Sequence, residues 1–270
     1  SNGEAIATIC QLVQGMPLSL LLSAAWIPLL SPAAIVEQLT PSPTPFGSSS
    51  LDFLESDWRG MNERQRSLRL VFERSWQLLT AELQLVFARL AIFRGGFRFE
   101  TAQIITKISL RQLLVLVNHS LVRRADDGRY DLHELIRQYA EEKMELSTDN
   151  GTTRSNHADY FKELLLQNSQ KFRRSGEAEA VTSLSSDAEN IRVAWQWLLS
   201  KSNFPELDRM ITPLALFYAL SGRSLEGERV FQNAFDELNR KVQRIPDLAM
   251  IQRLQAHTLL WLTDFQSGSV

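Results

Sequence analysis

One stretch of the sequence alternates in the way that β-strands do, and helical patterns lie on both sides of it. Leu121 to Arg124 and Arg129 to Leu132 are short β-type runs joined by Ala-Asp-Asp-Gly. An Asp-Gly turn between two such runs is a strong signal for a β-hairpin. Elsewhere the apolar residues recur at helical spacing. We therefore expect a mainly α-helical chain with this hairpin as its only sheet.

The segments around the hairpin predict a winged-helix arrangement. Thr80 is placed to cap one helix, and Gly95-Gly96 breaks the pattern after it. After the hairpin, GRYDLHELIRQYAEEKM, from Gly128 to Met144, continues into an amphipathic helix that begins at His133. Helix, helix, helix, two-stranded wing, helix is the order of a winged helix, which we place at 61–150. The helices expected before the hairpin cover 65–79, 80–90, about 99–107 and 109–118.

Two more helical regions flank this part. At the N-terminal end, helical spacing over 4–14 and 17–27 is broken by Gly15 and Pro17, and a third helix is expected from Pro32 to Leu39. Together with the Pro- and Ser-rich linker PSPTPFGSSS, they make a helical subdomain at 1–60. From 151 to 270, two-helix units of roughly 35 to 40 residues fit a tetratricopeptide-like helical array. Its helices are expected at 155–171, 177–200, 206–220, 224–240 and 247–263.

Composition excludes several classes of protein. The formal charge of −2 over 270 residues gives no global basic field for nucleic acid or anionic membranes. The single cysteine, Cys10, excludes an internal disulfide and suits a reducing cytoplasm; its apolar neighbours predict that it is buried. The longest apolar run, Pro17 to Leu30, is too short to span a bilayer, so we expect no membrane partner. The chain's two ends suggest a piece excised from a longer protein.

Four stretches of the chain, in order, resemble one protein family. GMPLSLLLSAAWI resembles the Gly-x-Pro-Leu stretch of the NB-ARC and related STAND signal-transduction ATPases. RQRSLRLVFERSWQLLTAELQLVFARLAIFRGGF and NHSLVRRADDGRYDLHELIRQYAEEKM resemble the two ends of their winged-helix domain. DAENIRVAWQWLL and GRSLEGERVFQNAF resemble the helical sensor of the bacterial members. The resemblance implies the C-terminal part of such an ATPase, with ADP or ATP and Mg²⁺ as cofactors of the longer parent.

This chain lacks the catalytic part that the family requires. The phosphate-binding motif Gly-x-x-x-x-Gly-Lys-Ser/Thr does not occur in it. We therefore expect no enzyme activity and no cofactor for the chain alone, and an upstream nucleotide-binding domain as a partner. No serine–histidine–acid set or Gly-x-Ser-x-Gly motif is found, and the remaining histidines are too scattered for a metal site: His119, His157 and His257.

The resemblance assigns nucleotide-sensing roles to three residues. In the family, the motif proline packs on the adenine ring, which carries over to Pro17, with Gly15 shaping the turn. The alternative for Pro17 is a helix-start proline without a ligand. The family's Met-His-Asp motif corresponds to Leu132-His133-Glu134, and its histidine contacts the β-phosphate of ADP. Glu134 departs from the motif, because glutamate caps a helix poorly and would compete with phosphate at the helix N-terminus.

Strand alternation gives an independent expectation for His133. Tyr130 and Leu132 share one strand face, so His133 belongs to the polar face with Arg129 and Asp131. This arrangement argues against a core histidine. It leaves either a surface histidine at a helix start or one with a partner elsewhere.

A basic segment raises direct DNA binding as the alternative function. Between residues 94 and 124, six basic residues face one acid, Glu100, a local charge of +5. The helix that would enter the major groove, SLRQLLVLVNHS, is apolar nearly all round, so we expect it to be buried, with DNA the less favoured partner. It offers Arg111, Gln112 and Asn118 for base edges. The basic residues are Arg94, Arg98, Lys107, Arg111, Arg123 and Arg124.

Taken together, these patterns predict a regulatory fragment of a nucleotide-gated, transcription-regulating switch. Nucleotide state would be coupled to an effector protein, peptide or small molecule on the helical repeats. The aromatic residues of the repeats are expected to be their core.

Overall fold

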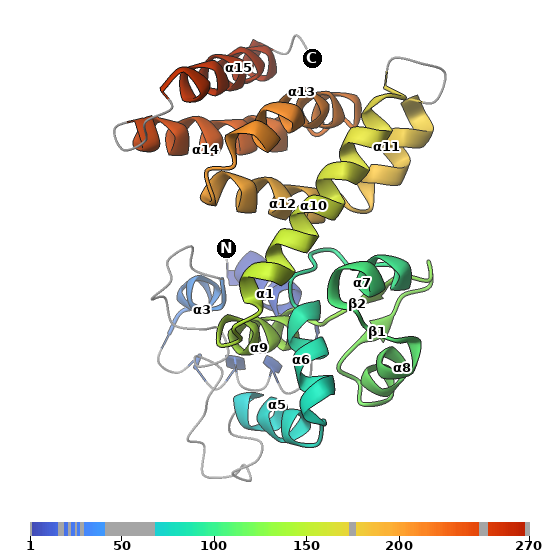
Figure 1. Cartoon of the computed structure of the whole chain (residues 1–270). Coiled ribbons are helices and arrows are strands. Elements are labelled where there is room, and N and C mark those ends of the chain that lie inside the picture. The colour runs from blue at the N-terminus through green and yellow to red at the C-terminus, as the bar shows by residue number, and fades with distance from the viewer. Residues whose placement is uncertain are drawn as a thin grey trace. The chain divides into compact units, whose positions relative to one another are not determined.

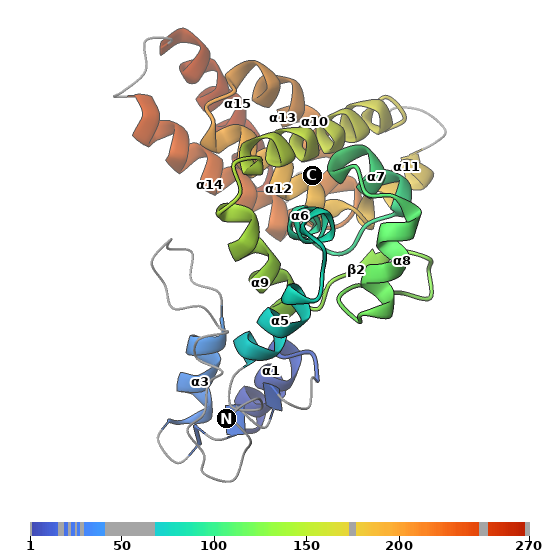
Figure 2. The ribbon, with the colours of Figure 1, turned by 60° about the horizontal axis from the view of Figure 1, so that its bottom comes forward.

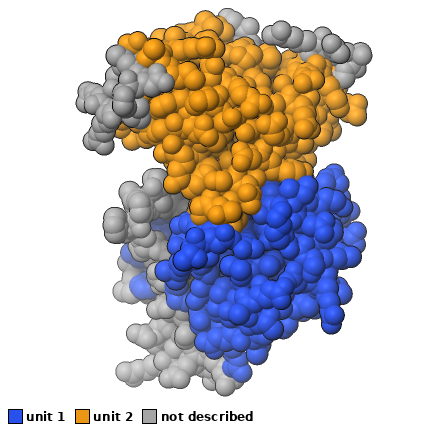
Figure 3. Space-filling view, in the orientation of Figure 1, with its two compact units in different colours: residues 1–92, 96–150 blue, residues 93–95, 151–270 orange. Residues whose placement is uncertain are grey.

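The computed structural model of the chain confirms the predicted fold class. It describes residues 2–15, 19–20, 23–24, 26–27, 30–40, 68–172, 177–242 and 248–267. Within these residues the chain is mainly helical, and β1 and β2 form one two-stranded antiparallel sheet (Figure 1). The chain divides into two compact units (Figure 3): unit 1 is 1–92 with 96–150, and unit 2 is 93–95 with 151–270.

Unit 1 has the order of elements expected for its middle and C-terminal part. Before the hairpin lie α1 (Asn2–Leu12), α3 (Pro32–Leu39), α5 (Leu68–Gln77), α6 (Ala81–Leu90), α7 (Phe99–Thr106) and α8 (Leu110–Asn118). The hairpin is β1 (Arg123–Arg124) and β2 (Tyr130–Asp131), and α9 (Glu134–Glu145) follows it. The linker at 41–50 lies outside the described residues, as do residues 17–18, 21–22 and 25 of the helix expected at 17–27.

Local side-chain chemistry sets several helix starts in unit 1. The Thr80 hydroxyl accepts a hydrogen bond from the Leu83 N–H, as a helix cap should. Ser109 and Gln112 form a capping box at the start of α8, each side chain bonding to the other's backbone N–H. Ser31 caps α3, in which Pro32 occupies the first turn.

The loop after α6 is held to the hairpin by a close backbone approach. Phe97 and Tyr130 exchange two backbone hydrogen bonds of 2.8 Å. Gly96 precedes this bridge with φ +84°, and a Cβ at Gly96 would lie 2.9 Å from the Tyr130 carbonyl oxygen. Glycine is therefore required here both for the conformation and for the space.

The core of unit 1 forms where α9 packs against α6 and α5 (Figures 1 and 2). The Tyr139 ring on α9 lies near Phe72 and Trp76 on α5, with centroid separations of 5.9 and 6.1 Å. Its hydroxyl donates a 2.6 Å hydrogen bond to Glu73 Oε2, which also pairs with Lys143 at 2.8 Å. The pKa of Glu73 is lowered, first by the hydrogen bond from Lys143.

Two expectations for single residues in unit 1 are wrong. Cys10 is exposed rather than buried, because the buried face of α1 is formed by Ile9, with Val13 just beyond the helix end. Arg129, expected on the polar face, is only 5% exposed and donates a 3.0 Å hydrogen bond to the Gly96 carbonyl. The loop at Gly96 covers that face of the hairpin and supplies the acceptor.

From residue 151 onward, the described part of unit 2 consists of helices joined by short turns. Its elements are α10 (Asn150–Ser169), α11 (Glu177–Ser185), α12 (Ala188–Ser200), α13 (Phe204–Leu220), α14 (Ser224–Val242) and α15 (Leu248–Ser267). The single helix expected at 177–200 is two helices, because the chain turns at Ser186-Asp187.

Helices α12 to α15 pack as neighbours along the chain and also across one position. Helix α12 contacts α14, and α13 contacts α15. At Gly227 on α14, a Cβ would lie 2.8 Å from Phe265 Cζ and 3.0 Å from Tyr218 Cβ. Gly227 therefore lets α14 approach its neighbours closely. The naming of this array as tetratricopeptide-like stays a prediction, as do the predicted domain boundaries.

Candidate functional site

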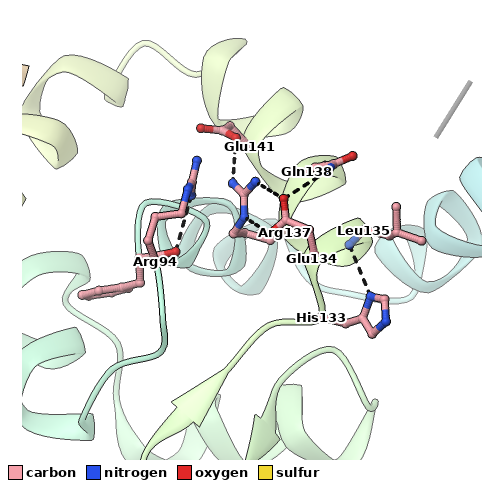
Figure 4. Close-up of polar contacts among 8 residues, drawn as sticks. Arg94, His133, Glu134, Leu135, Arg137, Gln138 and Glu141 are labelled. Carbon is pink, nitrogen blue, oxygen red and sulfur yellow. Dashed lines mark hydrogen bonds and ion pairs between the residues drawn. The ribbon is translucent and has the colours of Figure 1, made fainter. Parts of the chain in front are cut away.

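His133 lies at the start of α9 and bonds through both ring nitrogens. It is the N-cap residue, and its Nδ1 accepts a 3.3 Å hydrogen bond from the Leu135 N–H (Figure 4). Its Nε2 lies 3.1 Å from the carbonyl oxygen of Val13. The tautomer that serves both contacts is the neutral ring with the proton on Nε2, donating to Val13. The histidine is half-buried and has a partner 120 residues away in the sequence.

The surroundings of His133 favour this neutral form. Burial lowers the pKa of the imidazole, and the nearby Arg123 lowers it further. The hydrogen bond to the Val13 carbonyl and the carboxylates of Glu134 and Asp131 act in the opposite direction, but the net shift is downward. Protonation would remove the Nδ1 acceptor that caps α9, so charge on this ring and the capped helix start are incompatible.

The partner of His133 lies next to another predicted site residue. Val13 follows directly on α1, and its side chain is fully buried. Gln14 and Gly15 then take left-handed backbone conformations, with φ +49° and +69°, and the Gly15 N–H bonds to the Cys10 carbonyl at 3.0 Å. The structure thus ties His133 to the turn that Gly15 shapes. Pro17 lies outside the described residues, and the nucleotide roles of all three residues stay predictions.

Glu134 is engaged away from the helix start. Its carboxylate accepts hydrogen bonds of 2.6 and 2.8 Å from Arg137 and one of 3.1 Å from Gln138 (Figure 4). Glu141 binds the same guanidinium at 2.8 Å. Arg137 holds the Glu134 carboxylate along α9 and His133 supplies the cap, while the competition of Glu134 with phosphate stays a prediction.

Arg137, which was not among the residues predicted to be functional, is buried at the start of α9. Its side chain is only 9% exposed. Although burial opposes the charge, Glu134 and Glu141 raise the pKa of Arg137. The i, i+3 and i, i+4 spacing of the two glutamates on one helix was the available signal.

The expectation that the α8 helix is buried is wrong. Leu113 and Leu116 are 1% and 0% exposed, but Leu110 and Leu114 on the other face are 61% and 58% exposed. Arg111 and Asn118 are exposed as well, while Gln112 is half-buried and donates to Glu82 at 2.7 Å. Apolar residues occur on nearly every side of α8, yet only one face of the helix packs in the core. The other face of α8 is therefore exposed.

The basic residues of the predicted patch differ in their surroundings. Arg123 is exposed but pairs with Asp131 across the hairpin at 2.7 Å. Arg94, which we counted in the patch, belongs to unit 2 and lies in its own hydrogen-bonded setting. Four basic residues of the patch are exposed in unit 1 and form no ion pair with another described residue: Arg98, Lys107, Arg111 and Arg124.

The described residues contain neither a metal-binding cluster nor a membrane-spanning helix. No group of three or more histidine, cysteine, aspartate or glutamate side chains is placed to hold a metal ion within them. Across the same residues, no helix has the length and apolarity needed to cross a bilayer.

Comparison with known proteins gives distant relatives. No protein family and no solved structure matches the chain. Proteins named "Putative HTH-type transcriptional regulator" from Mycobacterium bovis and from two strains of Mycobacterium tuberculosis are 28% identical to it over 269 residues. The match covers 96% of this chain but 29% of each relative, so the chain spans less than a third of their length.

Proposed function

We propose that this chain is part of a transcription regulator that contacts DNA directly through α8 and the adjoining hairpin. The exposed face of α8 is the observation that carries the proposal, because the element expected to enter the major groove is available to do so. The names of the relatives, which describe helix-turn-helix regulators, support the same function.

The chemistry of this face suits a duplex. Arg111, Leu114 and Asn118 are spaced by three and four residues, so they lie on one side of the helix. Arginine can bond guanine edges, asparagine can bond adenine edges, and an apolar side chain can contact a thymine methyl. Lys107 before the helix and Arg124 on β1 are exposed cations for phosphate contacts.

Binding of a labelled generic duplex, measured by fluorescence anisotropy over a salt series, tests the proposal. We expect binding at low salt that weakens steeply as salt rises. Lys107→Ala should reduce the slope of log K against log salt by about 1, and Arg111→Ala should weaken binding as well. Arg240→Ala, which removes an exposed charge from unit 2, is the matched control and should change neither value. No binding at low salt would contradict the proposal.

The contact of His133 with Val13 favours a second function, a nucleotide-linked switch in a longer parent protein. There an upstream domain would bind ADP or ATP with Mg²⁺, and the junction of α1 and α9 would form part of its closed state. His133→Ala should then weaken ADP binding in the parent protein and raise transcriptional output. His119→Ala, at the exposed residue that follows the end of α8, is the control. Unchanged ADP affinity and unchanged output in His133→Ala would rule this switch out.

A further inference from the structure

A groove of about 380 Å³ lies between α12 and α14 in unit 2. The two helices contact each other (Figures 1 and 2). The residues that line the groove span two turns of each helix, from Glu189 to Gln196 and from Glu226 to Asn233. Its volume lies in the range of small-molecule sites, about 300–1,000 Å³.

Two carboxylates and two guanidinium groups line the groove, and one of the guanidinium groups, that of Arg229, is not part of an ion pair with a described residue. The Glu189 carboxylate is held by Arg192, with hydrogen bonds of 2.6 and 3.0 Å. Glu226 lies 3.7 Å from Arg223. Arg229 is exposed and forms no hydrogen bond or ion pair with another described residue. Arg229 is therefore the side chain with which an anionic ligand in the groove would pair.

The other lining residues offer hydrogen bonds and an aromatic floor. Gln196 and Asn233 are exposed and have no hydrogen bond to another described residue, so both amides are available. Trp195 is 2% exposed and stacks on Phe231, with ring centroids 6.0 Å apart and planes at 23°. Its Nε1 has no hydrogen-bond acceptor among the described residues, and an unsatisfied buried donor is costly.

We propose that this groove binds a small carboxylic acid with a flat apolar body. Arg229 pairs with the carboxylate, Gln196 and Asn233 bond to its polar groups, and the body packs against Trp195 and Val230. A single unpaired cation and a volume of this size match one small anion better than an extended acidic chain. The proposal does not depend on the DNA contact described above, since all of its residues belong to unit 2.

The probe for this site is 2-naphthoate, with 2-naphthamide as its uncharged counterpart. Titration of the whole chain, followed through the indole N–H signals in NMR spectra, should show saturable binding of naphthoate with a dissociation constant of about 1 mM. The amide should bind at least tenfold more weakly. The Trp195 signal, assigned from a Trp195→Phe variant, should shift.

Two charge-matched variants locate the binding. Arg229→Gln should weaken naphthoate binding about tenfold and remove the preference for the acid over the amide. Arg240→Gln removes an exposed charge from the same helix outside the groove and should leave both affinities unchanged. The proposal is overturned if naphthoate shows no saturable binding, if acid and amide bind equally, or if the two variants behave alike. Binding of an acidic peptide without binding of naphthoate would also overturn it.

Discussion

His133 at the start of α9 and His157 in the interior of unit 2 both contact protein, but they differ in burial and in hydrogen bonding. His133 is half-buried, and both of its ring nitrogens have backbone partners. His157 is fully buried between Phe161 and Phe93, with ring centroids 4.6 and 5.6 Å away. Its Nε2 lies 3.5 Å from Asn190 Oδ1, and its Nδ1 has no partner among the described residues.

This difference gives the two histidines different roles: His133 connects two segments, and His157 packs in a core. His133 links two segments that are far apart in sequence, so its loss should be felt at that junction. His157 fills an aromatic interior, where burial disfavours the charged form of its imidazole. Burial lowers the pKa of His157 to about 3, with the hydrogen bond to Asn190 offsetting part of the effect. The two histidines should therefore respond differently to acid and to substitution.

The largest effect expected is the loss of stability of unit 2 in acid. Below pH 6.5 the unfolded imidazole of His157 takes up a proton that the folded one refuses until about pH 3. Stability present above pH 6.5 should thus be lost at about 1.4 kcal/mol per pH unit within that window. Hydrogen exchange of α10 and α12 amides, in the native chain and in His157→Gln, measures this slope. Equal slopes in the two proteins would contradict the assignment.

Asn190→Ala should have the next largest effect. The Asn190 side-chain oxygen accepts a 2.8 Å hydrogen bond from the Arg94 backbone N–H and lies near His157 Nε2. Losing the acceptor leaves a buried donor unsatisfied, so we expect unit 2 to lose about 2–3 kcal/mol. Asn190→Asp restores an acceptor at the same place and is the comparison. Chemical denaturation gives the values, and a loss below that of His133→Ala would reverse the expected order.

His133→Ala should cost about 1 kcal/mol, since it removes the cap of α9 and the bond to Val13. His133→Asn keeps a good capping group but is too short to maintain both contacts, so it should recover only part of the loss. Hydrogen exchange at Leu135 reports the cap. If the two variants behave identically, the Val13 contact rather than the cap carries the stabilisation.

The smallest effect is expected from Arg123→Gln. The Arg123 side chain is 58% exposed, and surface ion pairs such as that with Asp131 contribute about 0–1 kcal/mol. Stability should hardly change, but the pKa of His133 should rise because Arg123 lowers it. NMR titration of His133 measures the shift. An unchanged or lower pKa of His133 in Arg123→Gln would contradict this assignment, because removal of Arg123 and release of the Asp131 carboxylate both act to raise it.

The local features of the fold were predictable, and the long-range ones were not. Thr80 and the Asp-Gly turn act on their immediate neighbours, so helix and hairpin positions followed from the sequence. The break at Ser186-Asp187 was missed, because no glycine or proline marks it. The burial of Arg129 depends on a carbonyl 33 residues away, which no local pattern contains.

In the candidate site, too, the local features were predictable and the long-range contacts were not. Alternation argued against a core histidine, and His133 is half-buried at the start of α9, but its contact with Val13 could not be read from spacing. The exposed face of α8 was missed because a helix with apolar residues nearly all round can still pack on one side only. Leu110 and Leu114 remain on the surface, and composition alone cannot tell which side packs.

The three residues Phe93–Gly95 belong to unit 2, although the chain before and after them belongs to unit 1. Phe93 is 3% exposed within that unit, and Arg94 bonds there to Asn190. A recombination event at codon 150 would therefore not exchange unit 2 as a whole. The incoming C-terminal segment would meet a tripeptide that had been selected with another partner. The heritable module here is larger than its last 120 residues, and chimeras with their junction in the loop after α6 would test where it begins.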